Sequence, residues 1–435
     1  PYVAVEGRNT LEYDGDIEIH NAHDRQYTAF GMNANQFAFA YGRSAEQAAD
    51  AVRRGLAMDI AAEKQKKLAF YDRFAGKTAT EHECLFNKCL STMKSQLYAP
   101  EGRFTQIWST PDRVPHKKLW LWDSVFHALG FRNLDPALAQ DLILSMLQTQ
   151  AEDGFIPHMS TPTASSPITQ PPVIAWGAYH VYQTSGDRAF LQQAYECNRR
   201  FLAWCRDNRR EVDDELYTWL ISEELNCRCD ESGMDNSPRF DTESRLAAID
   251  FTCFMANETR YMAIIADTLG DVEAAAEYRA WYDAIRSAVN ATLWCDEDAF
   301  YYDYDIDSNR LHKIESVASF LPLFAGLCDE RQAAALVAQL HNPDTFCCEF
   351  PIPSISKRDK TFGTDMWRGP VWINYNYMIS EGLADYGYTD LARHIIEKTV
   401  AVLGEWYDKT GTIYEFYDSE NKKAPCLLNR KGLPF

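Results

Sequence analysis

No run of 18 or more apolar residues occurs in the 435-residue chain, so the sequence offers no candidate for a membrane-spanning helix. The N-terminal stretch PYVAVEGRN has neither an initiator methionine nor the basic-then-apolar order of a signal peptide. With 46% hydrophobic and 24% charged residues the composition is that of an ordinary globular protein. We therefore expect a soluble chain with a processed or trimmed N-terminus and no membrane partner.

Basic residues are in short supply, because 43 Lys and Arg stand against 63 Asp and Glu and give a formal net charge of −20. Proteins bind nucleic acids and anionic membranes through clustered cations that release counterions from phosphates. The charge balance therefore argues against both classes of partner. Nothing in the sequence defines an oligomeric state.

Paired CxxC motifs are also absent, although the chain contains 12 cysteines. Cys227 and Cys229, like Cys347 and Cys348, stand too close together for the spacing of a zinc site, and no histidine pair completes one. Most cysteines lie within apolar helical segments, as Cys205 does, which is typical of buried, reduced thiols. We expect no metal, no other cofactor and a cytoplasmic location.

The chain changes character near residue 52. Short alternating or aromatic runs broken by Gly, Asn and Asp occupy residues 1–52 and predict a short β-rich segment. A helical pattern begins with Ser44 as its N-cap, and we expect a long connecting helix that covers 53–78. The remainder, 79–435, forms the third predicted region.

This third region is almost entirely helical in its hydrophobic periodicity. Short turns such as SGD, LGD and YGYTD join several of the predicted helices, which must then fold back as antiparallel pairs. The pattern predicts a mainly α protein built as a helical toroid, with a small N-terminal β-containing segment. We expect eleven helices, at 80–98, 122–132, 135–150, 172–185, 187–207, 243–269, 271–293, 316–328, 329–341, 371–386 and 388–404.

Long loops recur after every second predicted helix, which would place them all at one end of a ring of hairpins. Loops beyond about 12 to 15 residues in a compact domain usually serve function. Trp accompanies Asp, Arg, Gln and Asn in these loops, and this combination suits carbohydrates because indoles stack on sugar faces while polar groups bind hydroxyls. For any single Trp, however, packing is the commoner role. The loops cover 99–121, 151–171, 208–242, 294–315, 342–370 and 405–435.

Hydrolysis of a glycosidic bond needs two carboxyl groups, one that protonates the leaving oxygen and one that activates water or attacks the anomeric carbon. Asp235 has a partly apolar setting beside Met234 that suits an acid, whereas Asp241 suits the N-cap of the next helix. Glu415, in the segment IYEFYD, is as compatible with a solvent-facing strand position as with catalysis. The residues alone do not choose among the seven loop carboxylates Asp123, Glu231, Asp235, Asp241, Asp365, Glu415 and Asp418.

The segment YYDYDIDSNRLHK at 301–313 imitates a calcium loop with its alternating acidic residues. It has neither the glycine at the sixth position nor the glutamate at the twelfth, where Ile314 stands. We therefore expect a β-hairpin with an Asp-Ser-Asn turn.

Five motifs together resemble a known family: LWLWDSVFH, ITQPP, ESGMDNSPRFD, WRGPVWINYNY and IYEFYD, in this order. They are similar to the (α/α)6-barrel glycoside hydrolases of family 63 and to the related family 37 trehalases, over about Leu119 to Asp418. The resemblance implies a six-hairpin catalytic barrel in 79–435. Such a barrel needs twelve helices and eleven are predicted, so either the closing C-terminal helix is missing from the chain or one helix assignment is wrong.

The resemblance also implies an exo-acting, inverting α-glycosidase with Asp235 as general acid and Glu415 as general base. The implied substrate is a short α-glucoside or a glucosylated small molecule, with mannose as a possible sugar. Asp123 is then expected to bind sugar hydroxyls rather than to transfer protons. The implied substrate-binding residues are Trp120, Trp122, Asp123, Gln170, Arg239, Trp367, Arg368, Trp372 and Asn374.

Two other classes use similar architecture. Polysaccharide lyases surround an acidic sugar with basic groups, and cations do occur in the loops at His116, Lys117, Lys118, Arg239 and Arg368. A catalytically silent glycan-binding protein would bind without turnover. The paired carboxylate motifs favour hydrolysis over both.

Overall fold

The computed structural model describes residues 2–6, 27–42, 44–73, 76, 79–112, 117–210, 214–222, 228–242 and 245–434. The chain divides into two compact units. The first comprises 1–87 and 110–117, and the second comprises 88–109 and 118–435. Within the described residues, no helix combines the length and the apolar character needed to cross a membrane.

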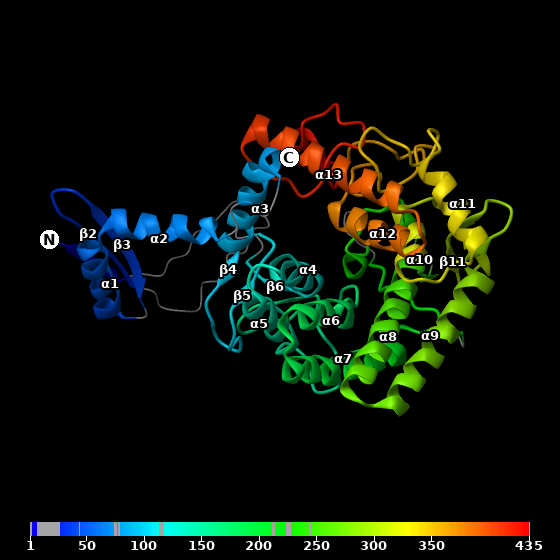
Figure 1. Ribbon diagram of the computed structural model, residues 1–435, viewed down its shortest axis with the longest axis horizontal. Coiled ribbons are helices and arrows are strands. Elements are labelled where there is room, and N and C mark those ends of the chain that lie inside the picture. The colour runs from blue at the N-terminus through cyan, green and yellow to red at the C-terminus, as the bar shows by residue number, and fades with distance from the viewer. Residues whose placement is uncertain are drawn as a thin grey trace. The chain divides into compact units, whose positions relative to one another are not determined.

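The first unit contains a three-stranded antiparallel sheet with one helix packed on it (Figure 1). Small side chains make this packing possible, because Ala29 of the sheet is buried against Ala48 and Val52 of the helix. The N-terminal segment is therefore strand-rich, as predicted, and the first helix belongs to its core. The elements are β1 (Tyr2–Glu6), β2 (Tyr27–Met32), β3 (Phe37–Gly42) and α1 (Ala45–Ala57).

The predicted connecting helix is interrupted. Ser44 caps α1 as expected, since its side chain accepts a hydrogen bond from the Gln47 amide. The helix ends at Ala57, and Asp59 then caps a second helix, α2 (Ile60–Asp72), by accepting from the Ala62 amide. An aspartate at this position satisfies the free N–H groups of a new helix, so the periodic segment forms two helices.

Helical hairpins dominate the second unit, and eleven α-helices lie between residues 83 and 410 of the described chain, in agreement with the predicted number. They are α3 (Glu83–Ser95), which crosses the boundary between the units, α4 (Leu121–Phe131), α5 (Pro136–Leu147), α6 (Ile174–Ser185), α7 (Arg188–Arg209), α8 (Ile249–Leu269), α9 (Val272–Thr292), α10 (Leu321–Phe324), α11 (Glu330–Leu340), α12 (Ile373–Asp385) and α13 (Thr389–Thr410). In the teal-to-orange part of the ribbon, α4, α6, α8, α10 and α12 follow one another around a common centre (Figure 1).

The even-numbered helices α4, α6, α8, α10 and α12 contact one another in this order. Each of α4, α6, α8 and α12 pairs with the helix that follows it. The turns behave as their sequences predict: Gly186 and Gly270 end helices in the left-handed conformation, and Asp187 and Asp271 cap the next ones. Since a long loop precedes each even-numbered helix, these loops gather at the N-terminal ends of the inner helices.

The predicted helix at 316–328 is largely absent. The chain there forms a 3-10 turn over Val317–Phe320 and only four α-helical residues, Leu321–Phe324. Gly326 adopts a positive φ of 72° shortly afterwards and stops the helix. The apolar residues remain buried, so their periodicity was correct for burial but not for helix length.

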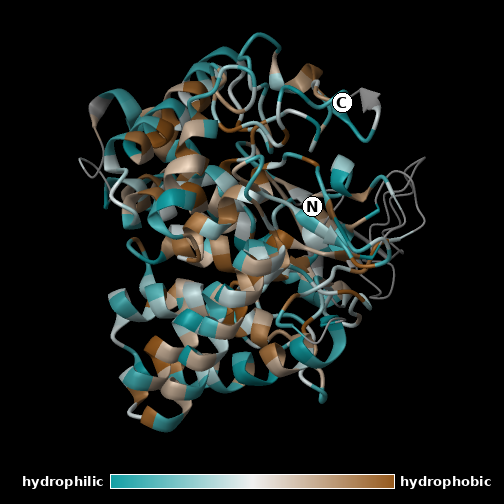
Figure 2. Cartoon of the chain, turned by 90° about the vertical axis from the view of Figure 1, so that its right-hand side faces the viewer, coloured by the Kyte–Doolittle hydropathy of each residue, from teal (hydrophilic) through white to brown (hydrophobic). Residues whose placement is uncertain are grey.

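Among the long helices of the described chain, α8 is the most buried, and its side chains are buried on all faces over most of its length. Most of the other long helices expose one side, and the ribbon coloured by hydropathy shows teal and brown residues on the same helices (Figure 2). This is the pattern of amphipathic helices around an apolar centre. The centre nonetheless includes polar residues of α8, among them Asp250 and Glu258.

Short strands support the loops that enter the inner helices. The segment 301–313 is the predicted hairpin, in which β11 (Asp303–Asp305) pairs with β12 (Arg310–His312) and the Asp305 carboxylate accepts from the amides of its turn. β11 also pairs with β8 (Leu246–Ala247), just before α8. The remaining short strands are β4 (Leu97–Tyr98), β5 (Trp108–Ser109), β6 (Leu119–Trp120), β7 (Met159–Ser160), β9 (Trp294–Cys295), β10 (Phe300–Tyr301), β13 (Asn429–Arg430) and β14 (Leu433–Pro434).

Candidate active site

The loop that carries Asp235 is shaped by two 3-10 turns, Asp230–Ser232 and Pro238–Phe240. Between them Gly233 has a φ of 71°, and the Ser232 hydroxyl accepts a hydrogen bond from the Met234 amide at 3.0 Å. Most of the loop is buried, but the Asp235 side chain remains 20% exposed. The backbone thus presents this carboxylate from an otherwise packed segment.

The residue after Asp235 connects this loop to residues 363–372, which contain the WRGP sequence and are called the WRGP loop below. The Asn236 side-chain oxygen accepts from the Trp367 amide at 2.9 Å. Trp367 is fully buried and stacks on Trp372, with ring centroids 3.9 Å apart and planes within 6°. Trp372 in turn faces Phe416, the neighbour of Glu415, at 5.1 Å. The hydrogen bond of Asn236 and this aromatic stack together connect the segments of the two candidate catalytic residues.

Glu415 lies on an extended segment that pairs with the same WRGP loop. Tyr417 and Val371 exchange two backbone hydrogen bonds, of 2.8 and 3.1 Å. Phe416 and Tyr417 are buried, whereas the Glu415 side chain is 43% exposed. Packing of its aromatic neighbours thus fixes the backbone while the carboxylate faces outward.

The two carboxylates meet consecutive residues of one β-turn. In the hairpin formed by β13 and β14, Arg430 forms an ion pair with Glu415, and the Lys431 ammonium lies 3.1 Å from Oδ2 of Asp235. Consecutive Cα atoms are only about 3.8 Å apart, so both carboxylates lie within one side-chain length of the same turn although they stand 180 positions apart in the sequence. Sequence reasoning missed both cations.

Two backbone–backbone hydrogen bonds and one bond to a side chain fix the position of this hairpin. The Asn429 amide donates to the Thr364 carbonyl at 2.9 Å, and the Asn429 carbonyl accepts from the Met366 amide at 3.1 Å. The Gly432 amide donates to the Asp365 carboxylate at 2.9 Å. The WRGP loop therefore holds the hairpin as well as the loop of Asp235 and the segment of Glu415.

The predicted residues of the LWLWD and ITQPP motifs adjoin the Asp235 loop. The Gln170 side-chain oxygen accepts from the Trp122 amide at 3.3 Å, and the Trp122 ring lies against Gly233. Trp120 packs edge-on against His158, with ring centroids 5.1 Å apart. Burial lowers the pKa of His158 to about 4, so its imidazole is neutral near pH 7.

Asp123 and Asn374 are half-buried in the first turns of α4 and α12, at the end of the inner helices where the long loops gather. Arg368 forms an ion pair with Asp241 and is 20% exposed. Asp241 therefore does not cap the next helix as predicted, because α8 begins only at Ile249 and short strand β8 intervenes.

Arg239 is placed differently from our expectation of a sugar-binding cation. Its side chain is fully buried, with hydrogen bonds of 2.6 and 2.9 Å to Asp250 and of 2.7 and 2.8 Å to Asp303. Burial acts to lower the pKa of Arg239, but the two carboxylates outweigh it and raise the pKa well above its usual value. Arg239 thus ties the Asp235 loop to α8 and β11, and its guanidinium faces carboxylates of the protein.

The role of Glu231, which the sequence left open, is structural. Its carboxylate is fully buried and accepts from the amides of Thr169 and Leu220 and from two nitrogens of Arg209. Because Thr169 directly precedes Gln170, Glu231 connects the ITQPP loop with the Asp235 loop. No pattern in the sequence indicated this contact.

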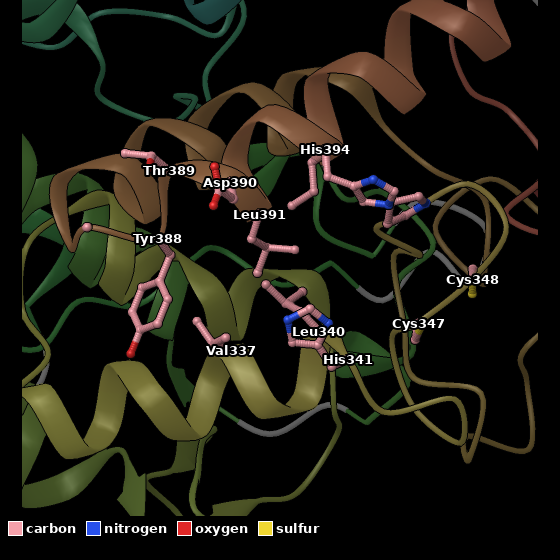
Figure 3. Close-up of a pocket in the computed structure, with 13 residues that line it drawn as sticks. Val337, Leu340, His341, Cys347, Cys348, Tyr388, Thr389, Asp390, Leu391 and His394 are labelled. Atoms are coloured by element: carbon pink, nitrogen blue, oxygen red, sulfur yellow. The ribbon is translucent and has the colours of Figure 1, made fainter.

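The described residues contain no group of three or more His, Cys, Asp or Glu side chains arranged to hold a metal ion. The predicted His116 and Cys227 fall outside that part of the chain. A cavity of about 600 Å³ lies between α11 and the start of α13 (Figure 3). Val337, Leu340 and Leu391 form part of its lining, and none of the candidate site residues does.

A comparison with known sequence families decides the classification. The family described as "Mannosylglycerate hydrolase MGH1-like glycoside hydrolase domain" matches residues 115–425. The chain belongs to this family of glycoside hydrolases. Its enzyme class is therefore glycoside hydrolase, in accord with the predicted family 63 relationship, and the lyase and silent-binder alternatives lose their support.

Curated relatives of this glycoside hydrolase include mannosylglycerate hydrolases of bacteria and a plant. The enzyme of Thermus thermophilus is 27% identical over 379 residues, which cover 66% of this chain and 88% of the relative. "Mannosylglycerate hydrolase MGH2" of Selaginella moellendorffii is 25% identical over 394 residues, which cover 70% and 77%.

Solved structures share the fold of this glycoside hydrolase. A family 63 mannosylglycerate hydrolase from Thermus thermophilus, determined in complex with glucose, superposes with a TM-score of 0.67 at 24% identity, over 77% of this chain and 93% of the other. Neutral trehalase Nth1 from Saccharomyces cerevisiae gives a TM-score of 0.63 at 18% identity, over 72% and 70%. The (α/α)6 toroid predicted from the sequence is thus confirmed as the fold class.

The contact between Gly233 and Trp122 predicts a sensitive position in this glycoside hydrolase. A Cβ at residue 233 would lie 2.5 Å from Cζ2 of Trp122, and its φ of 71° is unfavourable for alanine. We expect Gly233→Ala to lower the free energy of unfolding by about 2–4 kcal/mol and to reduce activity, because the strain acts on the Asp235 loop. Chemical denaturation and kcat at one pH measure the two effects.

Gly186→Ala is the matched control. Its φ of 68° is similar, but a Cβ there meets no atom within 4 Å, so only the backbone cost of about 1 kcal/mol is expected. Equal losses of stability in the two variants would show that the contact with Trp122 contributes nothing.

Proposed function

We propose that this glycoside hydrolase is an exo-acting, inverting α-glycosidase in which Asp235 is the general acid and Glu415 the general base. The observation that carries the proposal is the convergence of both carboxylates on the Arg430–Lys431 turn, because an acid and a base must act on the same glycosidic bond.

The proposed reaction is a single displacement. Asp235 transfers its proton to the glycosidic oxygen, which keeps the electron pair of the breaking bond to the anomeric carbon. Glu415 removes a proton from a water molecule on the opposite face, and the oxygen of that water forms the new bond to the anomeric carbon. Inverting enzymes hold such carboxyl groups about 6.5–9.5 Å apart to make room for the water.

We further propose that the substrate is the α-glycoside of a small hydroxy acid, with mannose or glucose as the sugar. Curated relatives carry the name mannosylglycerate hydrolase, and one related structure contains D-glycerate. In a chain with a net charge of −20, the candidate site contains Arg368, Arg430 and Lys431. A cation beside the acid, as Lys431 is, would favour a leaving group that bears a carboxylate.

Proton NMR of the released sugar tests this proposal. The purified chain would be incubated with the α-mannoside and the α-glucoside of D-glycerate, with α,α-trehalose, and with the methyl α-glycosides of both sugars. We expect fastest turnover of a glycerate substrate and initial release of the β-anomer. Initial release of the α-anomer would overturn the inverting mechanism, and faster turnover of the methyl glycosides would overturn the proposed substrate class.

A further inference from the structure

The turn that contacts Asp235 has an unusual residue at its first central position. Lys431 and Gly432 are the two central residues of the β13–β14 hairpin, with φ values of 53° and 78°. Positive φ at both positions defines a type I′ turn, in which Asn, Asp or Gly is strongly preferred at the first position. Turn geometry therefore does not explain why a lysine occupies this position, and the contacts of its side chain must be considered.

The Lys431 side chain contacts the proposed acid, and the hairpin that carries it is fixed by hydrogen bonds. The Lys431 ammonium lies 3.1 Å from Oδ2 of Asp235, and the two side chains are only 28% and 20% exposed. Backbone bonds from Asn429 and Gly432 to the WRGP loop fix the hairpin before any ligand arrives. The ammonium is thus held in place beside one oxygen, Oδ2, of the proposed acid.

The charge of Asp235 changes during the proposed reaction. The carboxyl group begins neutral and becomes a carboxylate as its proton passes to the leaving oxygen. A fixed cation beside it interacts more strongly with the transition state than with the ground state, which is the requirement for electrostatic catalysis. The neighbouring Arg430 differs, because its partner Glu415 loses negative charge in the same step.

We propose that Lys431 is a positioning residue that assists departure of the leaving group through Asp235, by stabilising the carboxylate that forms as Asp235 donates its proton. This inference rests on the proposed roles of Asp235 and Glu415. Lys431 stays protonated throughout, so the proton balance of the reaction is unchanged. The charged groups on the surrounding elements include Glu415 with Arg430, Asp365, and the Arg368–Asp241 pair. The Asp235 loop itself carries Glu231, paired with Arg209, and Arg239, paired with Asp250 and Asp303.

Dependence on pH provides the first test. The value of kcat/KM would be measured from pH 4 to 9 for the wild type, Lys431→Met and Lys431→Arg. The substrate would be the O-glycoside of the panel above that the wild type hydrolyses fastest. Because Lys431→Met removes the charge that stabilises the forming carboxylate, we expect the alkaline limb of its profile to move up, and only modestly because both side chains are partly exposed. Lys431→Arg keeps the charge and should leave the limb near its wild-type position.

Dependence on the leaving group provides the second test. Fluoride departs with little help from an acid, so the loss of kcat in Lys431→Met should be about 10-fold on an O-glycoside and at most about 2-fold on α-D-glucopyranosyl or α-D-mannopyranosyl fluoride. A role limited to packing would lower both rates equally. The position of a limb and the ratio of two rates do not depend on the fraction of folded protein.

The outcomes separate this inference from the proposed function. If Asp235→Asn keeps wild-type activity on the O-glycoside, the proposed acid is wrong and the inference falls with it. If Asp235→Asn is inactive while Lys431→Met shows an unmoved alkaline limb or equal losses on both substrates, Asp235 stands and the role of Lys431 is overturned. An alkaline limb that moves up in Lys431→Met and stays near its wild-type position in Lys431→Arg supports the inference.

Discussion

Replacement of Asp235 by asparagine is expected to lower kcat on an O-glycoside by about 10³- to 10⁴-fold, the upper part of the range for loss of a general acid. The amide has nearly the same shape as the carboxyl group but has no proton acidic enough to donate to the leaving oxygen. Stability should change little, because the side chain is partly exposed and its ion pair with Lys431 lies near the surface.

Glu415→Gln should cause a loss of similar size, and α-glycosyl fluorides distinguish the two residues. Fluoride hydrolysis needs the base but little of the acid, so Glu415→Gln is expected to remain severely impaired while Asp235→Asn recovers most of its activity. The reverse pattern would exchange the two roles. Stopped assays of fluoride release measure both.

Asp307→Asn and Glu405→Gln serve as matched controls for these substitutions. Both carboxylates are exposed, at 51% and 41%, and pair with surface cations. Each control should retain kcat within about 2-fold, since exposed ion pairs contribute little to stability. A loss in the controls as large as in the site variants would point to a general effect of charge removal.

Arg239→Met is expected to have the largest effect on stability, a loss of about 3–5 kcal/mol in the free energy of unfolding. The substitution preserves much of the apolar volume but leaves the carboxylates of Asp250 and Asp303 buried without their cation. Both aspartates are almost completely inaccessible to water, so solvent cannot replace the guanidinium. Urea denaturation followed by tryptophan fluorescence measures the change.

Arg245→Met is a close control because it removes another arginine–aspartate pair anchored on the same hairpin region. Arg245 and Asp307 are 55% and 51% exposed, so the expected change is below about 0.5 kcal/mol. If Arg239→Met lowered the free energy of unfolding as little as Arg245→Met, the buried ion pairs of Arg239 with Asp250 and Asp303 would not stabilise the fold. Adding Asp250→Asn and Asp303→Asn to Arg239→Met should recover part of the loss, because the uncompensated charges are gone.

Local signals in the sequence predicted most of the helical hairpins. Gly186 followed by Asp187, and Gly270 followed by Asp271, both end one helix and begin the next, and the structure uses all four residues in this way. Such C-caps and N-caps depend on the residue itself and on its immediate neighbours, so they can be recognised without tertiary information.

The errors arose where neighbouring signals competed. Asp59 resembled one more polar residue of a continuous helix, but its carboxylate caps a new one. Asp241 resembled a cap, but the chain first forms β8 by pairing with β11, about 60 residues further along. The segment 316–328 is buried as its apolar residues require, yet only four of its residues are α-helical. Periodicity indicates burial more directly than it indicates backbone conformation.

In the candidate site, too, local sequence signals predicted only part of what the structure shows. Chemistry nominated seven loop carboxylates, and only a family resemblance selected Asp235 and Glu415 among them. The environment of these residues depends on contacts across long sequence separations, such as Arg239 with Asp303 and Lys431 with Asp235. No spacing rule connects such positions. The ion pairs of Arg239 with Asp250 and Asp303, the contacts of Glu231 and the turn of Arg430 and Lys431 are therefore apparent only in the three-dimensional structure.

The turn at Lys431 and Gly432 has a consequence for protein engineering. A redesign guided by turn statistics would replace Lys431 with asparagine, the residue best suited to a positive φ, and would be expected to strengthen the hairpin. It would also delete the ammonium beside Asp235. Local conformational preference and the chemistry of the site thus select different residues at this position, and an improved melting temperature would be obtained at the expense of turnover.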